Sequence, residues 1–169
     1  KIVLYAPTFR GEGVFSKSYM DIDLDKLAEK LGNEYIIMYK MHPVSKYDKC
    51  QKCSNIINVC NESLYKLFAI SDMLVTDYSA VMYDYLILEK PMYFYTPDLS
   101  QYIAGRGIYW DYENYVPGKV CYSEDELAKS IVLEEEYMEK IKKMKYDFYD
   151  YLDGKSSNRI GDFISSFLS

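Results

Sequence analysis

Short apolar runs alternate with helix-like segments, and this pattern most restricts how the 169-residue chain can fold. Strands are expected over residues 2–6, 35–40, 56–59, 73–76, 91–95 and 119–121. Helices are expected over residues 23–31, 63–70, 80–88, 123–130, 134–151 and 157–168, and residues 99–118 are expected to form an aromatic loop. Strands that alternate with helices form a parallel sheet with helices on both faces. The sequence therefore predicts an α/β fold.

The chain is expected to form one main domain, since neither a linker nor an internal repeat divides it. We expect this domain over residues 1–152 and a C-terminal helical tail over residues 153–169. Because the chain starts at Lys1 inside a strand-like run, it is predicted to be a piece of a larger protein. No apolar stretch approaches the roughly 20 residues that a membrane-spanning helix needs.

A net charge of −6 argues against nucleic acid as a partner, because nucleic-acid binding normally requires a basic face. The basic run at residues 140–145 lies beside an acidic run at residues 134–139. This pattern favours a helix face with salt bridges, and contact with a membrane surface or a partner is the alternative. The 20 tyrosines are expected mainly to cover apolar surface, and their number does not identify any that stack on a base or sugar.

Side chains that can bind phosphate follow three of the predicted strands. Arg10 follows the first strand, Lys40 and His42 end the second, and Thr76–Ser79 end the fourth. Ligands of open parallel sheets bind outside the carboxyl ends of the strands. An arginine can clamp a phosphate with two N–H groups, and a histidine can donate to it or accept a proton near neutral pH. Each residue alone is compatible with a structural role, but together they predict a pocket for an anion.

Ser79 is expected to begin the helix that follows the fourth strand, where backbone N–H groups attract phosphate. The spacing here matches neither a Walker loop nor a dinucleotide-binding fingerprint. Arg106 and Asp111 lie in a loop whose glycines allow close approach to a ligand, so we count both as candidate donor-binding residues.

The four cysteines are expected to be free thiols. Cys50 and Cys53 form a Cys-x-x-Cys pair, whereas Cys60 and Cys121 stand apart. A structural zinc site usually takes its four ligands from two such pairs. We therefore expect no metal site, with zinc binding or redox chemistry at Cys50 and Cys53 as the less favoured alternative.

Several motifs resemble the C-terminal half of the CDP-glycerol glycerophosphotransferases that build wall teichoic acids. The matching segments are Leu4–Arg10, Lys40–Pro43, Ser71–Ser79, Asp84–Tyr85, Lys90–Tyr95 and Asp153–Ile160. Their order and spacing cover nearly the whole chain. One departure is Ala80, which stands where many members of the family have a second serine.

This resemblance implies a GT-B type transferase, in which two Rossmann-like domains face each other across a cleft. The chain would be the C-terminal half, which binds the nucleotide diphosphate donor, generally without a metal or other cofactor. The residues that the resemblance places around the donor phosphates are Arg10, His42, Thr76, Asp77 and Ser79. His42 is assigned a catalytic role in stabilising phosphate, since the family's usual candidate for the base is a histidine of the N-terminal domain.

The resemblance also implies a reaction. A hydroxyl at the end of a lipid-linked polymer attacks the β-phosphorus of CDP-glycerol, or of a related CDP-polyol, and CMP leaves. The missing N-terminal domain would be the other partner, and the place of action would be the inner face of the bacterial cell membrane. Two other functions stay open: a GT-B glycosyltransferase that uses a nucleotide sugar, and a nucleotide-binding module without catalysis.

Overall fold

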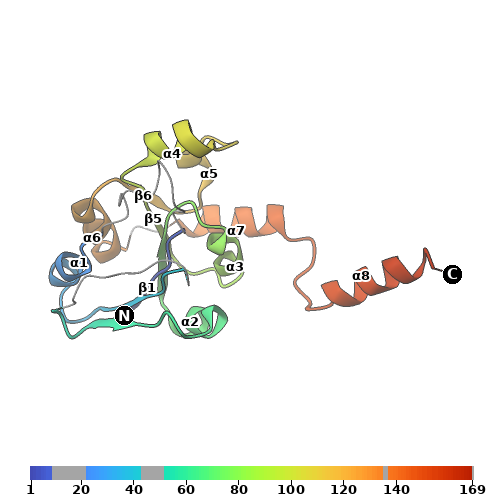
Figure 1. Cartoon of the computed structure of the whole chain (residues 1–169), viewed down its shortest axis with the longest axis horizontal. Helices are drawn as coiled ribbons and strands as arrows, with labels where there is room; N and C mark the ends of the chain where they lie inside the picture. The colour runs from blue at the N-terminus through green and yellow to red at the C-terminus, as the bar shows by residue number, and fades with distance from the viewer. Residues whose placement is uncertain (9–21, 43–51, 135–136, 169) are drawn as a thin grey trace.

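The computed structural model describes residues 1–8, 22–42, 52–134 and 137–168. In this part of the chain a six-stranded sheet has the order β3-β2-β1-β4-β5-β6, with all neighbours parallel (Figure 1). The strands are β1 (Ile2–Tyr5), β2 (Ile36–Tyr39), β3 (Ile56–Asn58), β4 (Met73–Thr76), β5 (Met92–Tyr95) and β6 (Lys119–Cys121). This is the strand order of a Rossmann-like fold, so the predicted α/β class is confirmed.

Helices cover both faces of the sheet, as the alternating pattern predicted (Figure 1). The helices are α1 (Leu24–Leu31), α2 (Leu64–Ile70), α3 (Val81–Leu86), α4 (Leu99–Arg106), α5 (Tyr112–Tyr115), α6 (Glu124–Val132), α7 (Met138–Phe148) and α8 (Ser156–Ser165). Successive strand residues face opposite sides, so Val3 and Tyr5 pack with α1 and α6. Leu4 packs instead with α2, α3 and α7, and the sheet therefore separates two hydrophobic cores.

The expectation of a loop over residues 99–118 was wrong, because α4 and α5 lie within it. Helix α4 buries Leu99 but leaves the rest of its length largely accessible, so it lacks a strong apolar stripe. Helix α5 is a single turn that buries Tyr112. Both helices lie beyond the carboxyl ends of the strands, above β5 and β6 in Figure 1.

Several helix boundaries also differ from the predicted ones. Helix α3 ends at Leu86 rather than at residue 88, and α8 ends at Ser165 rather than at residue 168. Helix α7 spans Met138–Phe148, whereas a helix over 134–151 was expected. Glu134 has a φ of 49°, a left-handed conformation that a right-handed helix cannot contain.

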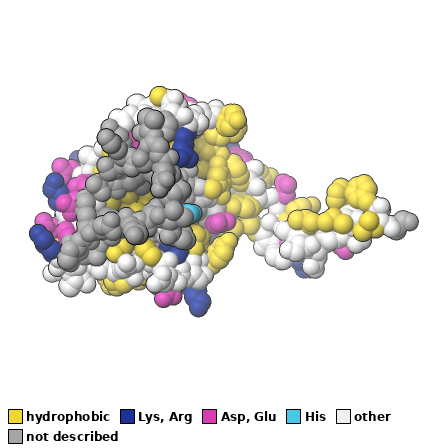
Figure 2. Space-filling model, in the orientation of Figure 1, with side chains coloured by type: hydrophobic (Ala, Val, Ile, Leu, Met, Phe, Trp, Pro, Cys, Tyr) yellow, Lys and Arg dark blue, Asp and Glu magenta, His cyan; other side chains and the backbone are white. Residues whose placement is uncertain are grey.

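Helix α8 extends away from the body of the molecule and has no buried residue (Figure 1). Figure 2 shows hydrophobic side chains along one side of this C-terminal segment. Ile160 and Phe163 of α8 are among the exposed hydrophobic residues. The helix is thus amphipathic, as its sequence predicted. Within the described residues, no helix has the length and apolar character needed to cross a membrane.

Gly118 permits a close approach between the segment that enters β6 and its neighbour β5. A Cβ atom at Gly118 would lie 2.0 Å from the backbone oxygen of Met92. We predict that Gly118→Ala lowers the free energy of unfolding by about 1–3 kcal/mol or more, because the backbone must shift. Urea denaturation measures this change. Gly161→Ala in α8 is the matched control, since its Cβ meets no atom within 4 Å, and equal stability of the two variants would contradict the prediction.

Candidate functional site

The strand order reverses between β1 and β4. In open α/β sheets the ligand crevice lies at such a reversal, outside the carboxyl ends of the two strands. From β1 the chain next forms β2 on one side, whereas β4 is followed by β5 on the other. Residues 6–8 leave β1 and residues 77–79 leave β4, so these two segments form the sides of the crevice. Thr76, Asp77 and Ser79 lie at this edge, as their positions after an apolar run predicted.

Asp77 and Thr76 join the two sides of the crevice. The Asp77 carboxylate accepts a hydrogen bond from the backbone N–H of Thr8, at 2.7 Å. The Thr76 hydroxyl donates to the carbonyl oxygen of Ala6, also at 2.7 Å. Both side chains are buried. They therefore hold the crevice in shape, a role that their positions after a strand did not reveal.

Ser79 lies at the open side of the turn and is half-buried. Its hydroxyl oxygen accepts a hydrogen bond from the backbone N–H of Val81 at 3.3 Å. The predicted helix start is off by one residue, because Ala80 rather than Ser79 occupies the N-cap position. The Ser79 O–H can still serve as a donor to a ligand, since the oxygen acts as acceptor in this bond.

Tyrosines hold the turn over residues 77–79 from the side of α4 and α5. The Tyr112 hydroxyl donates to the backbone carbonyl of Asp77 at 2.8 Å. The Tyr78 hydroxyl donates to the Asp98 carboxylate at 2.9 Å, and the Tyr78 ring stacks on Tyr102 with centroids 3.7 Å apart. Sequence reasoning missed these contacts, although the density of aromatic residues over 99–118 was a visible signal.

Lys40 and His42 lie at the end of β2, on the far side of β1 from the turn. The Lys40 ammonium donates to the carbonyl oxygens of Cys60 and Glu62, at 2.8 and 2.7 Å. An ammonium has three N–H donors, so within the described residues these two bonds leave one donor for a ligand. The His42 side chain is exposed and is the cyan group in Figure 2.

The other candidate residues lie outside this crevice or outside the described residues. Arg10 lies outside the described residues. Arg106 is the exposed last residue of α4, and Asp111 is the exposed N-cap of α5. The Asp111 carboxylate accepts a hydrogen bond from the Asn114 side chain at 2.7 Å. Between them, Gly107 turns the chain with a φ of 77°.

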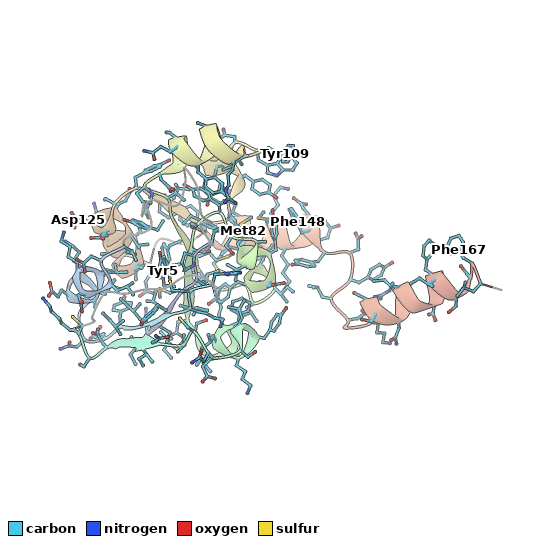
Figure 3. The ribbon with its side chains drawn as sticks, in the orientation of Figure 1. Tyr5, Met82, Tyr109, Asp125, Phe148 and Phe167 are labelled. Carbon is cyan, nitrogen blue, oxygen red and sulfur yellow. The ribbon has the colours of Figure 1, made fainter. Side chains whose placement is uncertain are left out.

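A pocket of about 230 Å³ lies directly beside the turn over residues 77–79. It is lined by residues 77–80 on one side and by aromatic residues of the α4–α5 segment on the other, including Tyr102, Trp110, Tyr112 and Tyr115. We call it the aromatic pocket. Burial and the hydrogen bond shared with the Tyr83 hydroxyl raise the pKa of Tyr115. The mouth of the pocket includes Tyr109, which is 99% exposed (Figure 3).

The described cysteines are free thiols: Cys53 and Cys60 are half-buried, and Cys121 is buried. Cys50 lies outside the described residues. In the part of the chain that the structure covers, no three His, Cys, Asp or Glu side chains are grouped so that they could hold a metal ion.

The order of the six parallel strands places the chain in the Rossmann-like class of α/β folds. A family comparison identifies the family. Residues 1–166 match the family model described as CDP-Glycerol:Poly(glycerophosphate) glycerophosphotransferase. The chain belongs to this family.

Relatives in the family include teichoic acid primases and polymerases. A teichoic acid ribitol-phosphate primase of Bacillus spizizenii is 38% identical over 100% of this chain and 45% of its own length. A teichoic acid glycerol-phosphate primase of Bacillus subtilis is 36% identical over 100% of this chain and 44% of its own. The chain thus spans less than half the length of these two relatives.

Solved structures of the wall teichoic acid polymerase TagF share the fold. One is 38% identical, has a TM-score of 0.79, and is matched over 98% of this chain and 43% of the TagF chain. A TagF variant soaked with CDPG has a TM-score of 0.73 and the same 98% coverage of this chain. The predicted resemblance to this family is therefore confirmed.

The Tyr112 hydroxyl should stabilise the turn that leaves β4. We predict that Tyr112→Phe lowers the free energy of unfolding by about 0.5–1.5 kcal/mol, because the Asp77 carbonyl loses its donor while the ring stays in place. Amide exchange over residues 77–80 should rise in the same variant, as seen by hydrogen–deuterium exchange. Tyr65→Phe is the control, because Tyr65 is 70% exposed on α2. Unchanged amide exchange over residues 77–80 in Tyr112→Phe would argue that this hydrogen bond does not stabilise the turn.

Proposed function

We propose that this chain is the donor-binding part of an enzyme that transfers a polyol phosphate from a CDP-polyol to a teichoic acid or a related polymer. The donor would be CDP-glycerol or CDP-ribitol. The observation that carries the proposal is the family match over residues 1–166, which includes every residue of the crevice. The names of the relatives, which include both glycerol-phosphate and ribitol-phosphate enzymes, support the substrate class.

In the proposed reaction a hydroxyl oxygen of the acceptor forms a bond to the β-phosphorus of the donor, and the bond to the leaving CMP breaks. Negative charge grows on the leaving phosphate, so hydrogen-bond donors fixed beforehand lower the barrier. We assign this role to the Ser79 hydroxyl and to the side chains of His42 and Arg10. Asp77 and Thr76 act indirectly, since they set the distance between the segment after β1 and the segment that carries Ser79.

The base that deprotonates the acceptor belongs, in this proposal, to the part of the protein that precedes the chain. Together the two parts would form a GT-B cleft. The acceptor would be lipid-linked and would be extended at the inner face of the membrane. Arg106 and Asp111 flank the aromatic pocket and are proposed to contact the donor from the α4–α5 side.

Calorimetric titration with CDP-glycerol, CDP-ribitol, UDP-glucose and CMP tests the proposal. We predict that the CDP-polyols bind more tightly than UDP-glucose. His42→Ala should weaken CDP-polyol binding by about 10-fold or more, as expected when a hydrogen bond to a charged group is lost. Ser79→Ala should weaken it by about 2- to 10-fold, because a single hydroxyl donor is removed.

Ser165→Ala on α8 is the matched control and should bind like the unmodified chain. A preference for UDP-glucose would favour a glycosyltransferase. Tight CDP-glycerol binding without any transfer in the full-length protein would favour a nucleotide-binding module. Unchanged affinity of His42→Ala for the CDP-polyols would show that His42 is not part of the binding site.

A further inference from the structure

The aromatic pocket lies against the turn that the proposed function assigns to phosphate binding, yet that function leaves the pocket without an occupant. Its outer wall contains Trp110 and Tyr115, whose rings stack with centroids 5.3 Å apart and planes 7° apart. Its inner wall contains Tyr78, stacked on Tyr102. The pocket thus presents flat apolar ring faces close to Ser79, which also lines it.

The lining of this pocket does not suit a phosphate group. Among the described residues that line it there is neither lysine nor arginine. Its one acidic residue, Asp77, is buried and binds the Thr8 amide. The remaining polar groups are mainly tyrosine hydroxyls, and those of Tyr83 and Tyr115 hydrogen-bond each other at 2.8 Å. The chemistry therefore favours an uncharged ligand with both apolar and hydroxyl groups.

We propose that the aromatic pocket binds an uncharged polyhydroxylated group, a polyol or a sugar, whose phosphate lies at Ser79. The inference rests on the proposed function and adds the place where the organic part of a substrate is bound. C–H groups of such a ligand pack on the ring faces of Trp110 and Tyr102, while its hydroxyls bond to tyrosine hydroxyls.

The volume of the pocket agrees with a small group of this kind. Pockets for drug-sized ligands measure about 300–1,000 Å³, so a pocket of about 230 Å³ suits a smaller group such as one short polyol. The open mouth at Tyr109 lets a longer chain continue into solvent. Two substrates can supply this chemistry: the polyol of the donor, or the polyol at the end of the acceptor polymer.

Trp110 provides a direct test, because it is the only tryptophan of the chain and lies in the pocket wall. The fluorescence of Trp110 is followed while CDP-glycerol, CMP or oligo(glycerol phosphate) is added. Calorimetry on the same samples measures binding of CDP-glycerol and CMP independently. We expect CDP-glycerol or oligo(glycerol phosphate) to change the emission, and CMP to leave it unchanged.

The responding ligand identifies the source. A response to CDP-glycerol alone assigns the pocket to the donor polyol, and a response to oligo(glycerol phosphate) alone assigns it to the acceptor. Tyr109→Ala should lower the affinity for the responding ligand by about 2- to 10-fold, while the affinity for CMP stays the same. Tyr146→Ala is the matched control, because Tyr146 is also exposed, at 85%, on α7.

Two results would overturn the inference while leaving the proposed function in place. One is an equal emission change with CMP and CDP-glycerol, which would assign the pocket to the nucleoside. The other is calorimetric binding of CDP-glycerol with no emission change from any ligand. If calorimetry detects no CDP-glycerol binding and the emission never changes, both the inference and the proposed function are wrong.

Discussion

The hydrogen bond from the Thr8 amide to the Asp77 carboxylate is the contact on which the arrangement of the crevice depends. Beyond the ladder bond from the Ala6 N–H to the Val75 carbonyl oxygen, the segments leaving β1 and β4 are joined by the Thr8–Asp77 and Thr76–Ala6 hydrogen bonds. A buried carboxylate must be hydrogen-bonded, and a buried amide without a partner costs about 1–3 kcal/mol. The bond gives the Thr8 amide its acceptor and gives Asp77 Oδ1 a donor without any ligand.

In the turn after β4, some residues support the fold and others are accessible to a ligand. Thr76 and Asp77 point into the protein and are buried, whereas Tyr78 and Ser79 are partly accessible. The same segment is held from three sides, by the loop after β1, by Asp98 after β5 and by Tyr112 of α5. Fixed donors cost little reorganisation when charge develops on a phosphate. The fold thus supports the proposed transfer by holding this turn rigid.

The strands were predictable because a parallel sheet covered on both faces needs continuous apolar runs. All six predicted strands are present, and the last, β6, is an edge strand as expected. Helix α4 was missed because it lies at the strand ends and buries little beyond Leu99. Site contacts were harder to predict for another reason. Asp77 binds Thr8 and Tyr112 at separations of 69 and 35 residues, and no spacing rule joins such pairs.

Lys40 shows why residue type at a strand end does not settle a role. Its position predicts a phosphate-binding role, and its ammonium also holds the carbonyls of Cys60 and Glu62 in the segment after β3. That contact joins the ends of β2 and β3, just as Asp77 joins those of β1 and β4. His42 follows Lys40 by two residues, so the loop that carries it begins from a fixed point. A cation that orders the backbone beside a site contributes to binding by fixing the position of its neighbours. Lys40 can therefore support ligand binding by fixing the position of His42.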